Sequence, residues 1–169
     1  MTMSSKKKAI TAVVGAAVVV FAGALAYALT PTPTRAIAPI SAPDPVALHQ
    51  LVEQGRYVAT ASDCIACHTV QGGKAFAGGH AIQSPIGNMY STNITPDKAT
   101  GIGSYTLGDF DRALRHGIRQ DGSTLYPAMP YPSYAKMSDQ DVRALYAYFM
   151  HGVEPVSYTH LTLPTILRV

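Results

Sequence analysis

The chain has 169 residues, enough for one domain together with additional segments. Its formal net charge at pH 7 is +3, but the positive excess comes from the two ends of the chain. Residues 36–155 contain eight Lys and Arg against ten Asp and Glu, a net charge of −2. The basic overall charge is therefore no argument for nucleic-acid binding, and we expect no nucleic-acid partner.

Residues 1–29 have the composition of a membrane-directed segment. A cluster of lysines, Lys6 to Lys8, precedes Ala9 to Leu29, an uncharged run of 21 residues rich in Val and Ala. A helix of that length spans roughly 30 Å, the thickness of the hydrocarbon core of a bilayer. We expect a transmembrane anchor with its N-terminus inside the cell. The alternative is a cleaved signal peptide, because Ala26-Tyr27-Ala28 resembles an A-x-A cleavage site. Either interpretation places the following residues outside.

Residues 30–44 are predicted to form an extended linker, because five of the sixteen residues from Thr30 to Pro45 are proline. Asp44 and Pro45 then predict a helix start, with a side-chain acceptor at the N-cap and a proline where no N–H is needed. Apolar residues recur at helical spacing up to about Ala61. Gly55 lies on this apolar face, where either a second helix crosses or a glycine is tolerated.

The two cysteines of the sequence lie in the pentapeptide Cys64-Ile65-Ala66-Cys67-His68. C-x-x-C-H is the attachment signature of a c-type haem. The two thiols add to the vinyl groups of the porphyrin, and the following histidine is placed under the iron as the proximal ligand. We therefore predict one covalently bound haem c, held through Cys64 and Cys67, with His68 on the iron.

Three other uses of a cysteine pair fit this sequence less well. A thioredoxin-like dithiol follows a strand in a βαβ pattern, whereas the residues before Cys64 have the pattern of a helix. A structural zinc site needs four ligands, and no second pair has the matching spacing. A disulfide across two residues would close a very small loop and stabilise little. The histidine that follows Cys67 favours haem.

The remainder of the domain is predicted to be a long irregular stretch followed by two helices. Residues 69–105 are rich in Gly, Pro, Ser, Thr and Asn, and a buried haem would provide apolar surface for such loops. The segment Thr106–Asp109 resembles a capping box, with Gly117 at the expected C-cap. Ser138 and Gly152 bound the last helix in a similar way. One helix before the motif and two after it suit a mostly α, class I cytochrome c-like domain.

The second axial ligand is expected to be a methionine or a histidine if the iron serves outer-sphere electron transfer. Met137 and Met150 belong to the last helix, where packing in the core is their expected role. Met129 lies in a loop whose three prolines could hold its sulfur in place. We therefore predict Met129 as the ligand, with Met89 as an alternative. Four histidines are further candidates, each individually expected at the surface or as a cap: His49, His80, His116 and His151.

Five further stretches carry a resemblance to a known family: Gly78-Gly79, Tyr90 to Asp97, Thr100 to Gly103, Leu125 to Tyr134 and Ala144 to Met150. With the haem motif, they resemble the cytochrome c subunits of bacterial membrane-bound dehydrogenases, which serve alcohol, aldehyde, gluconate or sorbitol dehydrogenases and molybdenum hydroxylases. The resemblance covers residues 45–155. It implies that Cys64 and Cys67 hold the haem, that His68 and Met129 are its axial ligands, and that electrons pass from the dehydrogenase to ubiquinone or another cytochrome.

The chain departs from that family in its number of haem motifs. Members usually carry three modules in a much longer chain, and this sequence has one, which resembles the first. A DNA string that encodes Val156 to Thr165 resembles the transposon-end adapter of sequencing libraries. We therefore expect the natural sequence to stop at about Pro155, and further haem modules to have been lost when the sequence was assembled. If residues 156–169 are genuine, they would form a disordered tail.

The sequence thus predicts an electron-transfer subunit rather than an enzyme. Its donor would be a dehydrogenase catalytic subunit. The haem domain would be tethered to the bacterial inner membrane and face the periplasm, because c-type haem is attached on that side. A haem enzyme or gas sensor, with Met129 off the iron and an open distal site, is the alternative. A purely structural anchor subunit is a third hypothesis.

Overall fold

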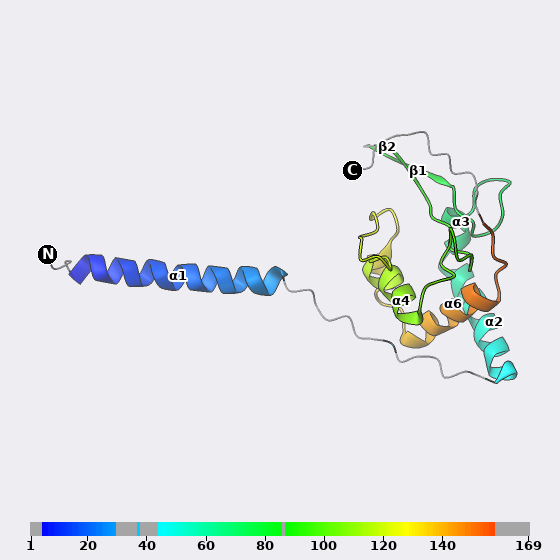
Figure 1. The fold of residues 1–169 in the computed structure, drawn as a ribbon, viewed down its shortest axis with the longest axis horizontal. Helices are drawn as coiled ribbons and strands as arrows, with labels where there is room; N and C mark the ends of the chain where they lie inside the picture. Colours follow the sequence, from blue (N-terminus) through cyan, green and yellow to red (C-terminus); the bar gives the residue numbers. More distant parts are fainter. Residues whose placement is uncertain (1–4, 30–36, 38–43, 86, 158–169) are drawn as a thin grey trace. The chain divides into compact units, whose positions relative to one another are not determined.

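The computed structural model describes residues 5–29, 37, 44–85 and 87–157, with the side chains of 5–12, 28 and 29 left aside (Figure 1). The chain divides into two units, Met1–Arg35 and Ala36–Val169. The first contains helix α1, Ser5–Leu29, at the place where a helix was expected. Among the residues that the structure describes, no helix is both long and apolar enough to cross a membrane. The predicted transmembrane span therefore gains no support from the structure.

The second unit contains the three main helices predicted from the sequence. Helix α2 spans Pro45–Ala61, α4 spans Leu107–His116 and α6 spans Asp139–His151. Their starts are capped as expected. The Asp44 side chain accepts hydrogen bonds from two main-chain N–H groups of α2, and the Thr106 and Asp109 side chains form a complete capping box. The mostly α fold class is confirmed for this unit.

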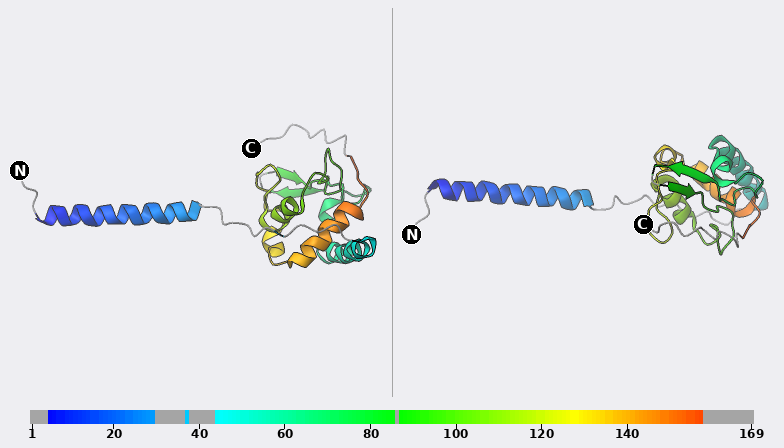
Figure 2. Two further views of the ribbon diagram at one scale, coloured as in Figure 1. Left: turned by 60° about the horizontal axis from the view of Figure 1, so that its bottom comes forward. Right: turned by 90° about the horizontal axis from the view of Figure 1, so that it is seen from above.

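A β-hairpin corrects the expectation that residues 69–105 are irregular. Strand β1, Ala81–Ser84, pairs antiparallel with β2, Gly87–Tyr90. Four-residue strands are too short for a clear alternation of apolar and polar residues, so the sequence pattern did not indicate them. Figures 1 and 2 show the hairpin lying away from the place where α2 and α6 pack together.

Two short helices complete the unit, α3 at Cys64–His68 and α5 at Tyr131–Tyr134. The second was not predicted, because three prolines in Leu125 to Pro132 suggested only a restrained loop. Pro132 is nevertheless compatible with α5, since it lies in the first turn of the helix, where a missing N–H is tolerated.

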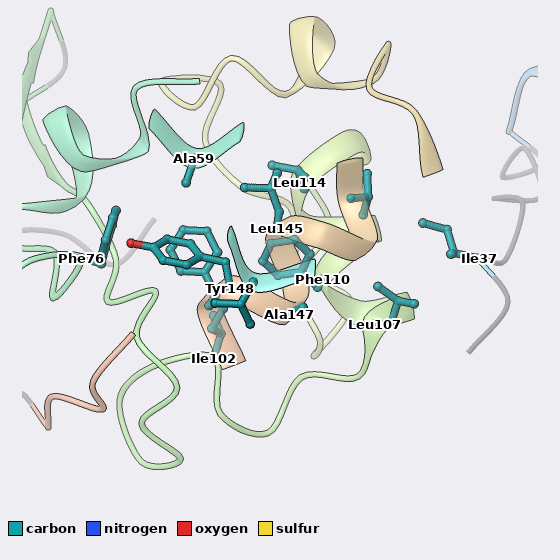
Figure 3. Packing of buried hydrophobic residues seen from close by; sticks show 13 residues of the cluster. Ile37, Ala59, Phe76, Ile102, Leu107, Phe110, Leu114, Leu145, Ala147 and Tyr148 are labelled. Carbon is teal, nitrogen blue, oxygen red and sulfur yellow. The ribbon is translucent and has the colours of Figure 1, made fainter. Parts of the chain in front are cut away.

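The core lies between α2 and α6, which pack closely at Gly55. A Cβ atom at this position would collide with the main-chain carbonyl of Ala144 and lie 2.6 Å from the Cβ of Tyr148. Gly55 is therefore a helix crossing point, one of the two interpretations that the sequence left open. Phe76 packs edge-on against Phe149, with ring centroids 5.2 Å apart. Figure 3 shows the cluster, whose members include Val52, Ala59, Ile102, Leu107, Phe110, Leu114, Val142, Leu145, Ala147 and Tyr148.

Ile37 and Val156, described residues near either end of the second unit, contact its folded part. Within residues 30–44, predicted to be a linker, the structure describes Asp44 and Ile37, and the side chain of Ile37 is buried in the core cluster. At the other end, the main chain of Val156 accepts a hydrogen bond from Asn93 Nδ2 at 2.7 Å and donates one to Thr95 Oγ1 at 3.1 Å. The rest of the predicted linker, and residues 158–169 of the predicted tail, lie outside the described residues.

Candidate functional site

The haem motif forms a helix of its own because the chain turns sharply before it. Asp63 has a left-handed backbone conformation, with φ of 52°, which Asp adopts more readily than most residues. Cys64 is half-buried, Cys67 is exposed, and both are free thiols. Burial raises the pKa of Cys64 to about 11. A redox-active dithiol has a lowered pKa instead, so the site does not favour thiol exchange.

His68 is oriented by the main chain of a distant loop. Its Nδ1 lies 2.8 Å from the carbonyl oxygen of Thr92. A hydrogen on Nδ1 donates to this oxygen and leaves Nε2 available to a metal, the usual arrangement of a ligating histidine. Burial lowers the pKa of His68, and the hydrogen bond to Thr92 opposes this effect only in part. The imidazole is thereby held in the neutral form that ligates iron.

Gly78 allows the Thr92 carbonyl to approach His68. The N–H of Gly78 donates to the carbonyl oxygen of His68 at 2.7 Å, and Gly79 donates to that of Ser91 at 2.9 Å. These two bonds bring the segment before the hairpin and the segment after it to the haem motif. Gly78 has a φ of 78°, and a Cβ atom there would lie 2.7 Å from the Thr92 oxygen. A side chain at this position would displace the carbonyl.

A cavity of about 330 Å³ opens beside α3, a size found among small-molecule and cofactor sites. Its walls come from α3, both strands, α4, α6 and the segment 125–130, and are mostly apolar and aromatic. Cys64, Cys67 and His68 line one part of it. The cavity therefore offers an apolar volume directly next to the two thiols and the imidazole.

The structure separates the methionine candidates from the histidine candidates for the second ligand. Met129 and Met89 both line the cavity and are half-buried. The loop at Met129 is restrained, because its carbonyl oxygen accepts a hydrogen bond from the N–H of Tyr131 at 2.8 Å. Met89 lies in β2 and pairs with Ile82 of β1, which also lines the cavity. The four histidine candidates are exposed and none lines the cavity: His49, His80, His116 and His151.

Residues 52–152 match the family described as Cytochrome c. The chain belongs to this family. Its cytochrome c domain is 64% identical over 107 residues to the gluconate 2-dehydrogenase cytochrome c subunit of Pantoea cypripedii, covering 63% of this chain and 24% of that protein. Over the same length it is 64% identical to the cytochrome c subunit of the quinone-dependent alcohol dehydrogenase of Gluconobacter oxydans, covering 63% and 22%.

A third relative is the fructose dehydrogenase cytochrome subunit of Gluconobacter japonicus, 53% identical over 132 residues, which are 75% of this chain and 27% of that protein. The cytochrome c chain thus spans about a quarter of the length of each of these three relatives. The similarity to cytochrome c subunits of dehydrogenases, expected from the sequence motifs, is confirmed.

The residues of the cytochrome c domain fit a covalently attached haem. Cys64 and Cys67 are unpaired thiols at one part of an apolar cavity. The hydrogen bond of His68 to the Thr92 carbonyl leaves Nε2 for the iron. Met129, which the sequence predicts as the second ligand, lines the same cavity. Its place on the iron stays a prediction, as does that of His68.

Sequence reasoning missed two groups that organise this cytochrome c site. The Thr92 carbonyl leaves no signal in the sequence, because every residue carries a main-chain oxygen. The hydroxyl of Tyr134 donates to the carbonyl oxygen of Ser62 at 3.0 Å and so joins α5 to the end of α2. Burial raises the pKa of Tyr134, which keeps the hydroxyl protonated and able to donate. Tyr134 was noted only as part of the family resemblance.

Proposed function

We propose that this cytochrome c domain transfers single electrons from a dehydrogenase to a further carrier. The observation that carries the proposal is one apolar cavity lined by two free thiols, a main-chain-oriented histidine and a methionine in a restrained loop. When bound, the haem supplies an iron centre that accepts and releases one electron. One haem c is proposed for this chain.

Each residue of the site has a distinct part in this proposal. Cys64 and Cys67 would anchor the haem covalently, and His68 would ligate through Nε2 while the Thr92 carbonyl orients its ring. Met129 would be the second ligand, which would leave no open position for a substrate or gas. A thioether ligand also raises the reduction potential, compared with a second imidazole. The apolar walls of the cavity keep water away from the metal.

The proposed electron donor is the catalytic subunit of a dehydrogenase. The relatives support this proposal, since they are named as cytochrome subunits of gluconate, alcohol and fructose dehydrogenases. The proposed acceptor is ubiquinone or another cytochrome, because the sequence motifs resemble those of cytochrome c subunits that pass electrons to these carriers. The chain covers only part of the length of these relatives. We therefore propose the donor and the acceptor for a longer protein, of which this domain would be one module.

The proposed location of the haem domain is the periplasmic side of the bacterial inner membrane. Support comes from Lys6 to Lys8, followed by the apolar run Ala9 to Leu29, the pattern of an anchor or export signal. Attachment of a c-type haem on that side of the membrane agrees with it. Membrane association of the full chain, tested by fractionation before and after removal of residues 1–29, would distinguish the anchor from a cleaved signal.

Visible absorption spectra test the proposed function. The full chain would be produced with the haem-attachment machinery and measured in the oxidised and reduced states, as wild type, Met129→Ala and Met89→Ala. We expect low-spin haem in the wild type and in Met89→Ala. In Met129→Ala we expect high-spin haem that binds carbon monoxide, because the thioether ligand is lost.

Other outcomes would contradict the proposal at different points. An unchanged spectrum in Met129→Ala would remove Met129 from the iron. A wild type that is high-spin and binds carbon monoxide would favour a haem enzyme or gas sensor. A wild type without covalent haem would contradict the assignment of Cys64 and Cys67.

A further inference from the structure

Two polar side chains that follow Thr92 closely in the sequence are buried, those of Asn93 and Thr95. Asn93 is 8% exposed and Thr95 is 0% exposed. Burying a polar group is unfavourable unless it is hydrogen-bonded, so such groups normally have partners. Neither residue has a part in the proposed attachment or ligation of the haem. Their hydrogen bonds therefore indicate a second role for this segment.

The side-chain amide of Asn93 uses its full hydrogen-bonding capacity. Its Nδ2 donates to the carbonyl oxygen of Val156 at 2.7 Å and to Thr100 Oγ1 at 3.0 Å. Its Oδ1 accepts from the main-chain N–H and the hydroxyl of Thr95, at 2.9 and 2.7 Å. An amide has two donor hydrogens and two acceptor positions, and all four are occupied. The Asn93 side chain is thereby fixed in one orientation.

Asn93 and Thr95 together hold the main chain of Val156 at two points. The Val156 carbonyl oxygen accepts from Asn93 Nδ2, and the Val156 N–H donates to Thr95 Oγ1 at 3.1 Å. Both contacts use main-chain atoms, which every residue carries apart from the missing N–H of proline. The two side chains can therefore hold position 156 whichever residue follows Pro155 in the natural sequence.

Asn93 also shares a peptide plane with the carbonyl that orients His68. The Thr92 carbonyl and the Asn93 N–H belong to one planar unit, whose tilt is set by ψ of Thr92 and φ of Asn93. Main-chain hydrogen bonds anchor the residues on either side, Ser91 to His80 and Ile94 to Phe76, both at 2.9 Å. The plane between these anchors can still tilt. Fixing the Asn93 side chain restricts φ of Asn93, and with it the direction of the Thr92 carbonyl.

We infer that Asn93 and Thr95 form a binding site for the main chain that leaves the domain, and that its occupation by position 156 positions the Thr92 carbonyl against His68. The inference rests on the proposed haem-carrying function, in which His68 ligates the iron. Asn93 is a positioning residue, because it acts on His68 through Thr92. The segment that continues beyond the domain is thereby coupled to the proximal ligand.

Release of position 156 has a consequence for the reduction potential. The carbonyl partner on Nδ1 raises the basicity of a ligating imidazole. A looser bond between His68 and Thr92 makes the imidazole a weaker electron donor, so the oxidised iron loses more stability than the reduced iron. The midpoint potential therefore rises when the site is emptied.

Hydrogen exchange measured by NMR on the reduced, haem-loaded full chain tests this coupling. The main-chain N–H of residue 156 reports on the binding site, and the His68 Nδ1–H reports on its bond to Thr92. Asn93→Asp replaces the donating NH2 group by an oxygen that repels the carbonyl of residue 156, and Thr95→Val removes the hydroxyl without changing the shape. In each variant we expect both protons to exchange about tenfold faster, as for the loss of one hydrogen bond of ordinary strength. Spectroelectrochemistry should show a higher midpoint potential.

Two matched variants are the controls. Asn88→Asp makes the same replacement at an exposed position of β2, and Val156→Ala keeps both main-chain groups of residue 156. Neither should accelerate the exchange of either proton. The N–H of Leu145, a residue of α6 that is 1% exposed, reports on global unfolding. Exchange at residue 156 and at His68 should stay faster than at Leu145 in every variant, because it occurs by local opening.

Several results would overturn the inference. Faster exchange at residue 156 with an unchanged His68 proton would show that the site is not coupled to the ligand. Unchanged exchange of both protons in Asn93→Asp and Thr95→Val would remove the binding site itself, and faster exchange in Val156→Ala would show that the valine side chain holds the segment. Rates equal to that of Leu145 would mean that the domain opens as a whole. The wild-type visible spectrum separates these results from a failure of the proposed function, which fails only if the wild type lacks low-spin covalent haem.

Discussion

The Nδ1 atom of His68 lies 2.8 Å from the main-chain oxygen of Thr92, a residue 24 positions further along the chain. This hydrogen bond orients the ring of the expected iron ligand, and the missing side chain of Gly78 leaves space for the Thr92 carbonyl. We predict that Gly78→Ala displaces the Thr92 carbonyl and frees the His68 ring. Haem retention should fall. The unfolding free energy should fall too, by more than the cost of a left-handed non-glycine residue, which is about 1–2 kcal/mol.

The control for this prediction is Gly72→Ala. Gly72 has a similar φ of 75°, but a Cβ atom there meets nothing within 4 Å. It should therefore show the backbone strain alone, with normal haem retention. Denaturant unfolding and haem content per protein measure the two effects. Equal losses in both variants would mean that the Thr92 carbonyl is not positioned by Gly78.

The crossing of α2 and α6 depends on Gly55. In Gly55→Ala the new methyl group meets the main-chain carbonyl of Ala144, and the helices must separate. We expect a loss of about 3 kcal/mol in unfolding free energy, at the upper end for an overpacked core. Gly108→Ala in α4 is the matched control, because the nearest atom to its Cβ is Thr106 Oγ1 at 3.8 Å. That variant should be neutral or stabilised by up to about 1 kcal/mol. A stable Gly55→Ala protein would contradict the tight crossing.

Arg115 forms a buried ion pair within α4 and also contacts the start of α6. Arg115 pairs with Asp111, whose side chain is 3% exposed, and its Nη1 also contacts Asp139 Oδ1 at 3.0 Å. Arg115→Ala would leave the Asp111 charge buried without its partner. We expect the unfolding free energy to fall by about 3–5 kcal/mol. Thermal and denaturant unfolding of the haem-loaded chain measure this loss.

The exposed pair of Arg56 and Glu53 is the comparison for that prediction. Their side chains are 52% and 49% exposed, so water and salt screen their attraction. Glu53→Gln should change the unfolding free energy by less than about 1 kcal/mol. If Arg115→Ala were as mild as Glu53→Gln, Asp111 would be solvated or protonated rather than held as a buried ion.

Asp97 should give the domain an acid-sensitive contribution to stability. Hydrogen bonds from the main-chain N–H and the hydroxyl of Thr100, at 2.7 and 2.8 Å, lower the pKa of Asp97 below its ordinary value of 3.8. The folded state therefore favours the carboxylate more than the unfolded state does. The contribution is complete above the unfolded pKa and disappears as the pH falls through the folded one.

Unfolding of wild type and Asp97→Asn across this pH range measures the contribution. The variant should be less stable at neutral pH, and the difference should shrink progressively below about pH 4. Asp44→Asn is the comparison, because it makes the same replacement at the N-cap of α2, where Asn also caps a helix well. A constant difference between wild type and Asp97→Asn at all pH values would show that the charge of Asp97 is not what stabilises its turn.

Local signals in the sequence determined the three main helices of the second unit and the chemistry of the haem motif. Asp44 with Pro45, Thr106 with Asp109, and Ser138 each act on N–H groups within a few residues, so their effect does not depend on the rest of the fold. The same holds for Cys64 to His68, whose spacing alone matches the chemistry of haem attachment. The short strands gave no such signal, and the choice of Met129 as second ligand depended on the three prolines of its loop.

Tertiary structure decided which groups meet. It brought Met129 and Met89 to the cavity and left the four candidate histidines at the surface. It also joined His68 to Thr92, and assigned Gly55 to a helix crossing. These outcomes depend on contacts between residues distant in sequence and on main-chain atoms common to every residue. Side-chain identity therefore determined the local caps and the haem motif, whereas the packing of the helices and loops determined the surroundings of the haem site.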